Sequence, residues 1–187
     1  MKKIIKTIMV AVAVVISLTA CAQKSANQTK GDDMNKSLII YFTHSGNTEL
    51  AAKDLQKITG ADIVRLYPEK PYSSEDVDWV NEQSRCTQEH LNQTLRPAIK
   101  PLGVNIADYD TIYIGFPIWW HEEPAVIRTL LDTVDFSGKE LYPFCTSYES
   151  PMSEADANLQ KGFPTLKWHT GLRLPSTPEQ IKEWIGK

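Results

Sequence analysis

Cysteine is scarce in this chain, with three residues among 187. Cys21 belongs to a short segment near the N-terminus, which leaves Cys86 and Cys145 for the rest of the sequence. These two residues fall in different predicted elements. The sequence leaves a disulfide between them open and favours two free thiols, with Cys145 as a buried strand residue.

Apolar runs long enough to cross a bilayer are also missing. The N-terminal run Ile8–Leu18 follows three lysines and is too short for a permanent membrane helix. It ends in Leu18-Thr19-Ala20-Cys21, which resembles the lipobox of bacterial lipoproteins, where the cysteine is lipidated. We therefore expect residues 1–21 to be a lipoprotein signal, with Cys21 anchoring the protein to a membrane of the bacterial cell envelope. The alternative is an ordinary cleaved signal with a coincidental cysteine.

Basic residues are too few to suggest a nucleic-acid partner. Removal of residues 1–21 takes three lysines from the 20 basic residues, which leaves 17 against 23 acidic ones, a formal charge of −6. Residues 22–36 lack large apolar side chains apart from Met34 and predict a flexible tether, so the folded domain is expected at residues 37–187. A start at Met34 is the alternative to export and would yield the same domain in the cytoplasm.

The rest of the chain alternates between strand and helix patterns, without internal repeats or low-complexity tracts. Strand patterns are expected at residues 37–42, 63–67, 111–115 and 140–147, and an extended segment at 166–174. Helix patterns fall between them at residues 50–60, 124–134 and 154–161, and after Thr177. This alternation predicts an α/β fold with a parallel sheet that is covered on both faces.

A polar turn follows the first strand pattern at Thr43-His44-Ser45-Gly46-Asn47-Thr48. It should lie at the carboxyl edge of the sheet and at the start of a helix, where free N–H groups favour an anion. The turn contains neither lysine nor arginine and matches neither GxxxxGK[ST] nor GxGxxG, which argues against a nucleoside triphosphate or a Rossmann dinucleotide. A phosphate group is the expected occupant, and an ordinary capped helix is the alternative.

Aromatic side chains follow two other strand patterns at the same edge. FPIWWHEEP, residues 116–124, comes after the third strand, and TSYES, residues 146–150, after the fourth. Large aromatic faces in such loops suit a flat conjugated ring, although core packing is the alternative for one tryptophan of the pair. A phosphate at one loop and a flat ring between the other two describe flavin mononucleotide (FMN).

These segments resemble the flavodoxin family, whose members carry a GNT phosphate loop and a GxPxWW loop. The similar segments are THSGNT (43–48), GFPIWW (115–120), FCTS (144–147), Arg96-Pro97 and GLRL (171–174) followed by IKEWI. The resemblance implies a three-layer fold with a five-stranded parallel sheet in the order 2-1-3-4-5. It also implies FMN as cofactor.

The resemblance assigns roles to the residues at this edge. Those expected to hold the phosphate are Thr43, Ser45, Gly46, Asn47 and Thr48, with His44 contributing chiefly backbone. Those expected to border the ring are Pro117, Ile118, Trp119 and Trp120, with Thr146 and Ser147 on its far side.

The third loop departs from the family pattern. Family members usually continue it as TSGGSG, whereas this chain reads TSYESPMS, so Tyr148 is expected either to close over the ring or to block it. The segment His121-Glu122-Glu123 lacks the HExxH spacing of a metal site, and no metal is expected.

No side chain of the sequence is an obvious general base or nucleophile, so the cofactor is expected to carry the chemistry. The predicted function is electron transfer to a redox protein or a small acceptor. The alternatives are an FMN-dependent NAD(P)H:quinone-type reductase and a lipid-anchored scaffold without cofactor.

Overall fold

The computed structural model describes residues 36–186. The predicted lipidation site Cys21, the tether and Met34 lie outside the described residues. Between residues 36 and 186, no helix has both the length and the apolar character needed to cross a bilayer. In chain order the elements are β1 (Ser37–Tyr41), α1 (Asn47–Thr59), β2 (Asp62–Arg65), the 3-10 helix η1 (Glu75–Val77), α2 (Arg85–Leu91), the 3-10 helix η2 (Ile106–Asp108), β3 (Thr111–Pro117), α3 (Ala125–Thr133), β4 (Glu140–Thr146), α4 (Met152–Gly162), β5 (Lys167–Trp168), β6 (Leu172–Leu174) and α5 (Pro178–Trp184).

The sheet is parallel throughout, with the order β2-β1-β3-β4-β5 and with β6 also paired to β4. The predicted order 2-1-3-4-5 is therefore confirmed. The most apolar strands, β1 and β3, are neighbours in the middle of the sheet. There Ile39 of β1 lies between Ile63 of β2 and Tyr113 of β3. All strands end at one edge, to which the loops after β1, β3 and β4 belong.

The fifth position of the sheet is divided into two short strands. On the side of β4 that faces these two strands, the Leu141 carbonyl accepts a hydrogen bond from the His169 N–H. Alternate residues of a strand face the same neighbour, so Pro143 also faces the fifth position, where it has no N–H to donate. The pairing resumes at Phe144 with Leu172, after one extra residue on the outer strand.

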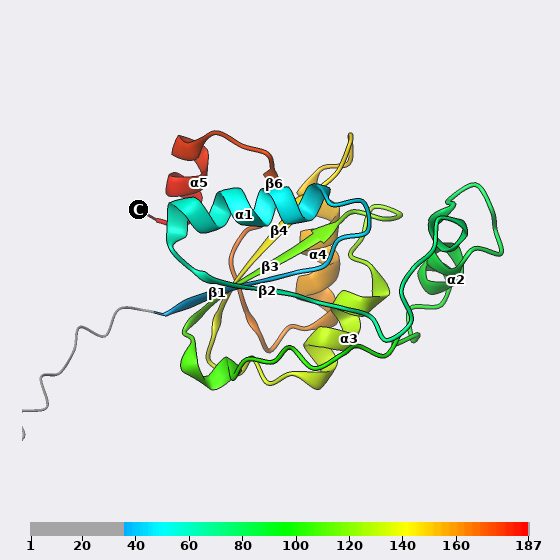
Figure 1. The fold of residues 1–187 in the computed structure, drawn as a ribbon, viewed down its shortest axis with the longest axis horizontal. Coiled ribbons are helices and arrows are strands. Elements are labelled where there is room, and N and C mark those ends of the chain that lie inside the picture. The colour runs from blue at the N-terminus through cyan, green and yellow to red at the C-terminus, as the bar shows by residue number, and fades with distance from the viewer. Residues whose placement is uncertain (1–35, 187) are drawn as a thin grey trace, which may run out of the picture. The chain divides into compact units, whose positions relative to one another are not determined.

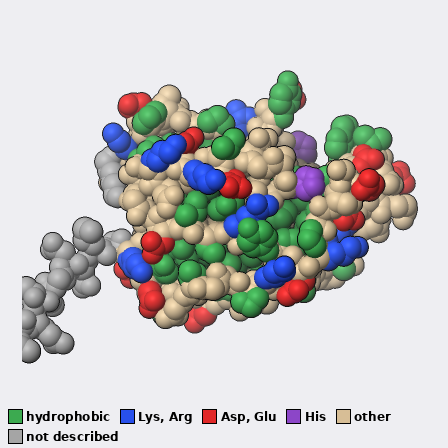
Figure 2. Space-filling view, in the orientation of Figure 1, with side chains coloured by type: hydrophobic (Ala, Val, Ile, Leu, Met, Phe, Trp, Pro, Cys, Tyr) green, Lys and Arg blue, Asp and Glu red, His purple; other side chains and the backbone are tan. Residues whose placement is uncertain are grey.

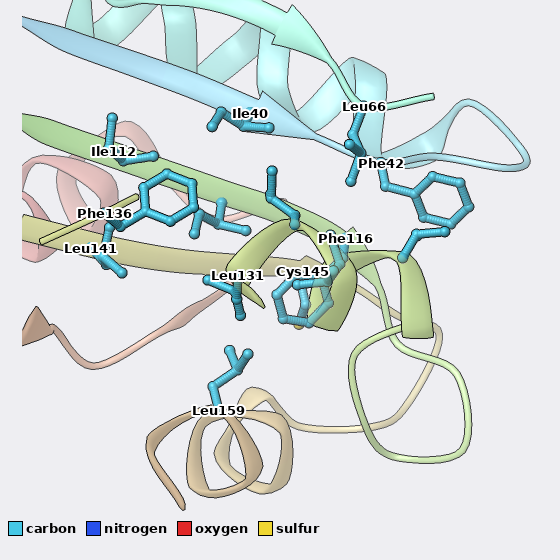
Figure 3. Packing of buried hydrophobic residues seen from close by; sticks show 14 of the residues in the cluster. Ile40, Phe42, Leu66, Ile112, Phe116, Leu131, Phe136, Leu141, Cys145 and Leu159 are labelled. Carbon is cyan, nitrogen blue, oxygen red and sulfur yellow. The ribbon is translucent and has the colours of Figure 1, made fainter. Parts of the chain in front are cut away.

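Helices cover both faces of the sheet, as Figure 1 shows. One face packs against α3 and α4 through side chains such as Ile112, Leu131 and Leu159 (Figure 3). The opposite face packs against α1 and α5 through Ile39, Leu55 and Ile181. Burial of large apolar side chains on both faces is the main stabilising contribution to the fold, on the order of 2 kcal/mol for each such side chain.

The helix ends follow from local sequence. Gly60 ends α1 in the left-handed conformation, with φ of 70°, and donates its N–H to the Gln56 carbonyl. Thr177 and Gln180 form a reciprocal capping box at the start of α5. Pro124 precedes α3 with φ of −60°, which suits the start of a helix.

The long connection from β2 to β3 contains α2, a helix that the sequence analysis did not predict. Its seven residues are mostly polar, but Thr87 and Glu89 are buried in the fold. Figure 1 shows α2 and its flanking loops beside the sheet rather than over either face. The segment therefore lies close to the edge at which the strands end.

The centre of β3 leaves no room for a side chain at Gly115. A Cβ atom built there would lie 2.2 Å from the ring of Phe144, which is fully buried. We therefore expect Gly115→Ala to lower the free energy of unfolding by about 1–3 kcal/mol, because a packed core resists added volume. Gly162→Ala is the matched control, since a Cβ at Gly162 meets nothing within 4 Å. Urea denaturation measures both changes, and equal effects would contradict this packing.

Candidate functional site

The polar turn after β1 ends in an open helix start. The turn is held by Gly46, whose N–H donates to the Thr43 hydroxyl at 2.9 Å and whose φ is 93°. A left-handed conformation of this kind is cheap for glycine and costly for other residues. Helix α1 begins at Asn47, and no side chain caps its first N–H groups. This end of α1 can therefore donate hydrogen bonds to an anion.

A hydrogen bond between two threonine hydroxyls joins α1 to the end of β4. Thr48 Oγ1 and Thr146 Oγ1 lie 2.8 Å apart, and the Thr48 side chain is fully buried. The two residues are far apart in sequence, yet both belong to the predicted phosphate and ring loops. Their bond holds the phosphate loop beside the loop after β4.

An arginine from β2 supports the polar turn from behind. Arg65 Nη2 donates to the Thr43 carbonyl at 3.2 Å, and Nη1 lies 3.5 Å from a carboxylate oxygen of Glu49. Glu49 also accepts from Lys53 at 2.6 Å, and this contact lowers the pKa of its carboxyl group. Sequence reasoning missed Arg65, because the turn itself contains no basic residue and the arginine belongs to another strand.

A hollow of about 560 Å³, here called the main hollow, opens between α1 and the ends of β3, β4 and β6. Seven predicted site residues line it: Ser45, Asn47, Pro117, Ile118, Thr146, Ser147 and Tyr148. It also has five lining residues that the sequence analysis did not predict, namely Leu50, Ala51, Asp54, Leu174 and Pro175. Thr43, His44, Gly46 and Thr48 belong to the adjoining turn and first helical turn rather than to its lining. Ligand pockets of small molecules typically measure about 300–1,000 Å³, so the main hollow has a suitable size.

The loop after β4 leaves the main hollow open. Tyr148 lines its rim, and its side chain is 96% exposed, so the ring projects into solvent rather than filling the space. The Ser147 hydroxyl donates to the Ser150 carbonyl, and Arg173 donates to the Glu149 carbonyl at 3.2 Å. The chain thus fixes this loop with backbone-directed hydrogen bonds where the family pattern has glycines.

Neither ring of the tryptophan pair lies on the main hollow. Trp119 packs edge-on against Phe42 and Tyr72, with ring centroids 5.6 and 5.0 Å apart. Trp120 stacks on His90 at 4.9 Å with an interplanar angle of 7°. Core packing of one tryptophan was the alternative considered for the sequence. The expectation that both rings border a flavin stays a prediction.

The two tryptophans belong to a tight turn with unusual backbone angles. Trp119 and Glu122 exchange two backbone hydrogen bonds of 3.0 and 3.1 Å, while Trp120 and His121 have φ of 53° and 64°. A two-residue turn with positive φ at both central positions is normally built from Asn and Gly, so bulky residues here are strained. Such strain persists only where the surroundings hold the turn in place.

Glu122 provides that hold. Its Oε1 atom lies 3.0 Å from His90 Nδ1 and accepts from Gln93 at 2.7 Å, which attaches the turn to α2 and the residues that follow it. Arg128 of α3 approaches the same oxygen at 3.5 Å and donates to the Glu89 carbonyl at 2.9 Å. The turn that follows β3 is therefore fixed by polar side chains from two helices, among them the Arg128 guanidinium.

Glu123 is the most strongly perturbed carboxyl group of this region. Its side chain is buried, and Oε2 has no hydrogen-bond partner among the described residues. Burial raises the pKa of Glu123 to about 7, although Arg128, 3.6 Å away, works in the opposite direction. The carboxyl group is therefore poised to change its charge near neutral pH.

The remaining candidate groups are structural. Cys86 and Cys145 are both buried free thiols, which confirms the preference for free cysteines. Burial raises the pKa of the Cys145 thiol to about 12. Within residues 36–186, no three His, Cys, Asp or Glu side chains are grouped to hold a metal ion.

A comparison with known protein families shows which family this chain belongs to. The sequence model of the family described as flavodoxin matches residues 36–187. The chain belongs to the flavodoxin family. A search of curated proteins found no match to this flavodoxin.

Solved structures agree with this membership. A candidate flavoprotein from Bacteroides eggerthii is 38% identical, with a TM-score of 0.78, over 81% of this flavodoxin and 96% of that chain. A candidate flavoprotein from Bacteroides uniformis is also 38% identical, with a TM-score of 0.77, over 82% and 99% of the two chains. A flavoprotein from Lactobacillus acidophilus, solved in complex with FMN, shares the fold at 21% identity and a TM-score of 0.65, over 81% and 99%.

The titration of Glu123 predicts a pH-dependent stability of this flavodoxin. Because its folded pKa lies above that of the unfolded chain, Glu123 contributes stability that is complete below about pH 4.5 and is lost as the pH rises through about 7. Glu123→Gln keeps the shape of the side chain and stays neutral. We expect the unfolding free energy of the unaltered protein, relative to this variant, to fall by about 1–3 kcal/mol between about pH 5 and pH 8.

Urea denaturation of both proteins at the two pH values measures this difference. The comparison cancels titrations that the two proteins share. A difference that stays constant across this pH range would contradict the assignment.

Proposed function

We propose that this flavodoxin binds FMN in the main hollow and transfers electrons. The observation that carries the proposal is the meeting of an uncapped helix start with the ends of β3 and β4 around one hollow of about 560 Å³. The flavoprotein from Lactobacillus acidophilus that was solved with FMN supports the choice of cofactor.

The phosphate of FMN fits the start of α1. The free N–H groups of the first helical turn and the positive end of the helix dipole favour a dianion. Ser45 and Asn47 line the same end of the main hollow and add hydroxyl and amide donors. Arg65 adds positive charge behind the turn through its contact with the Thr43 carbonyl.

The ring of FMN fits the other end of the main hollow. Pro117 and Ile118 form the wall at the end of β3, and Thr146 and Ser147 form the wall at the end of β4. The Ile118 N–H donates to the Thr146 carbonyl at 3.0 Å, so the two walls keep a fixed separation. A rigid slot of this kind orients a flat ring and excludes water from one part of it.

The residues of the main hollow favour electron transfer over acid–base or nucleophilic chemistry. FMN, when bound, supplies the ability to accept and donate electrons. Asp54 is the only carboxylate among the described residues that line the main hollow, and the residue is exposed and paired with Lys57 at 2.7 Å. The protein's own contribution is therefore to bind and orient the ring.

The rim of the main hollow favours a second candidate, an FMN-dependent reductase. Tyr148 and Leu50 are 96% and 64% exposed and offer an apolar surface beside the proposed ring site. This surface suits a redox protein in the carrier function and a nicotinamide in the reductase function. Rapid bleaching of the bound flavin by NADH or NADPH alone would favour the reductase, whereas bleaching only with an added redox protein would favour the carrier.

The phosphate site predicts a selective effect of Asn47→Leu. The substitution removes an amide donor and adds bulk at the start of α1, so we expect FMN affinity to fall by roughly tenfold or more, equivalent to about 1.5–2 kcal/mol. Riboflavin lacks the phosphate, and its affinity should change by less than about twofold. Fluorescence titration of the flavin measures both constants.

Asn158→Leu is the matched control, because Asn158 is an exposed residue of α4 outside the lining of the main hollow. It should leave the affinity for both flavins unchanged. Equal losses of affinity for FMN and riboflavin in Asn47→Leu would contradict the placement of the phosphate at the start of α1. A protein that binds neither flavin would support the cofactor-free scaffold.

A further inference from the structure

A second hollow, of about 300 Å³, lies on the other side of the polar turn. Here it is called the second hollow, and it is lined from the turn by Phe42, Thr43 and His44. The main hollow is lined from the same turn by Ser45 and by Asn47, and the two share no lining residue. The second hollow is therefore a separate concavity at the same edge of the sheet.

The walls of the second hollow are aromatic and held in place. Phe42 and Tyr72 are buried in the core, with ring centroids 5.7 Å apart. The Tyr72 hydroxyl donates to Glu89 at 2.7 Å, and the Arg85 guanidinium lies 3.8 Å from the centre of the Tyr72 ring. A wall fixed from behind in this way loses little conformational entropy when a ligand packs against it.

The exposed side of the second hollow is formed by Tyr67, whose side chain is 49% exposed. Pro68 and Pro71 complete the apolar lining. Figure 2 shows hydrophobic side chains next to basic ones in the middle of the face of the domain that it draws. Apolar and aromatic walls on several sides suit a flat ring.

The charge of the second hollow is positive, although the domain as a whole is acidic. Arg65 and Lys100 both line it, and none of the described residues in its lining is acidic. Arg65 already contacts the Glu49 carboxylate and donates to the Thr43 carbonyl, but its Nε atom is buried without a hydrogen-bond partner among the described residues. Lys100 forms no side-chain ion pair with the described residues, while its backbone N–H is fixed to the Tyr67 carbonyl at 2.8 Å.

We propose that the second hollow binds a small aromatic carboxylate, with the ring against the aromatic lining and the carboxylate beside Arg65 and Lys100. The volume is at the lower end of the range for ligand pockets, which suits one or two fused rings rather than a nucleotide. Arg65 provides a buried donor and Lys100 a mobile cation for the carboxylate. The ligand and FMN do not compete for the same space, because the two hollows are lined by different residues.

Calorimetric titration of the purified full chain with 1-naphthoate tests the proposal, with the neutral amide 1-naphthamide as the comparison ligand. We expect 1-naphthoate to bind more tightly than 1-naphthamide. Lys100→Gln should weaken 1-naphthoate about three- to fivefold, as for a partly exposed ion pair, and leave 1-naphthamide unchanged. Tyr67→Ala should weaken both ligands about three- to tenfold, because the aromatic wall serves both.

Lys182→Gln is the matched control, because Lys182 lies on α5, which covers the opposite face of the sheet from Phe42 and Tyr72. 1-Naphthoate should still bind in the presence of saturating FMN. Loss of 1-naphthoate binding in the presence of FMN would place the probe in the main hollow and overturn the proposal. Equal binding of the two ligands, or equal effects of Lys100→Gln and Lys182→Gln, would also overturn it.

Discussion

The hydrogen bond between the Thr48 and Thr146 hydroxyls joins the start of α1 to the end of β4 at the carboxyl edge of the sheet. This contact fixes the phosphate loop against the loop after β4. It places the free N–H groups of α1 beside the loops after β3 and β4, and residues of all three line the main hollow, where we propose that FMN binds. Both threonines belong to elements that are packed into the core, and the bond is therefore held by burial on both faces of the sheet.

The turn after β3 is positioned differently, by charge rather than by packing alone. Glu122 connects the strained turn to His90 and Arg128, and Trp119 fills a space between Phe42 and Tyr72. Phe42 and Tyr72 of this aromatic group also line the second hollow. The long connection that carries α2 thus supports the loops of the site, although α2 itself lies beside the sheet rather than over either face.

Much of the fold could be predicted from the sequence, because strands buried on both faces appear as continuous apolar runs and helices as periodic ones. The polar turn was predictable too, since Thr43 to Thr48 combine a glycine with hydroxyl and amide donors between a strand and a helix. The strand order came from the family resemblance. Pro143 marks where the fifth strand is divided, but its effect depends on which neighbour it faces, and that is a property of the assembled sheet.

Residues that act through tertiary contacts could not be predicted. Arg65 supports the polar turn from another strand, and α2 is too short and polar to stand out in the sequence. The positions of the Trp119 and Trp120 rings depend on contacts with Tyr72 and His90, which are distant in the sequence. The residues adjacent to the two tryptophans do not indicate these contacts.

The binding of a phosphate dianion at the start of α1 is the central claim, and the phosphorus NMR signal of FMN mixed with the full chain tests it most directly. The free phosphate group changes its protonation with a pKa of about 6, so the signal of free FMN moves with pH through this range. The account predicts a displaced signal that no longer moves between about pH 5 and pH 8, because the helix N–H groups stabilise the dianion. A signal that shifts with pH as that of free FMN does would contradict it.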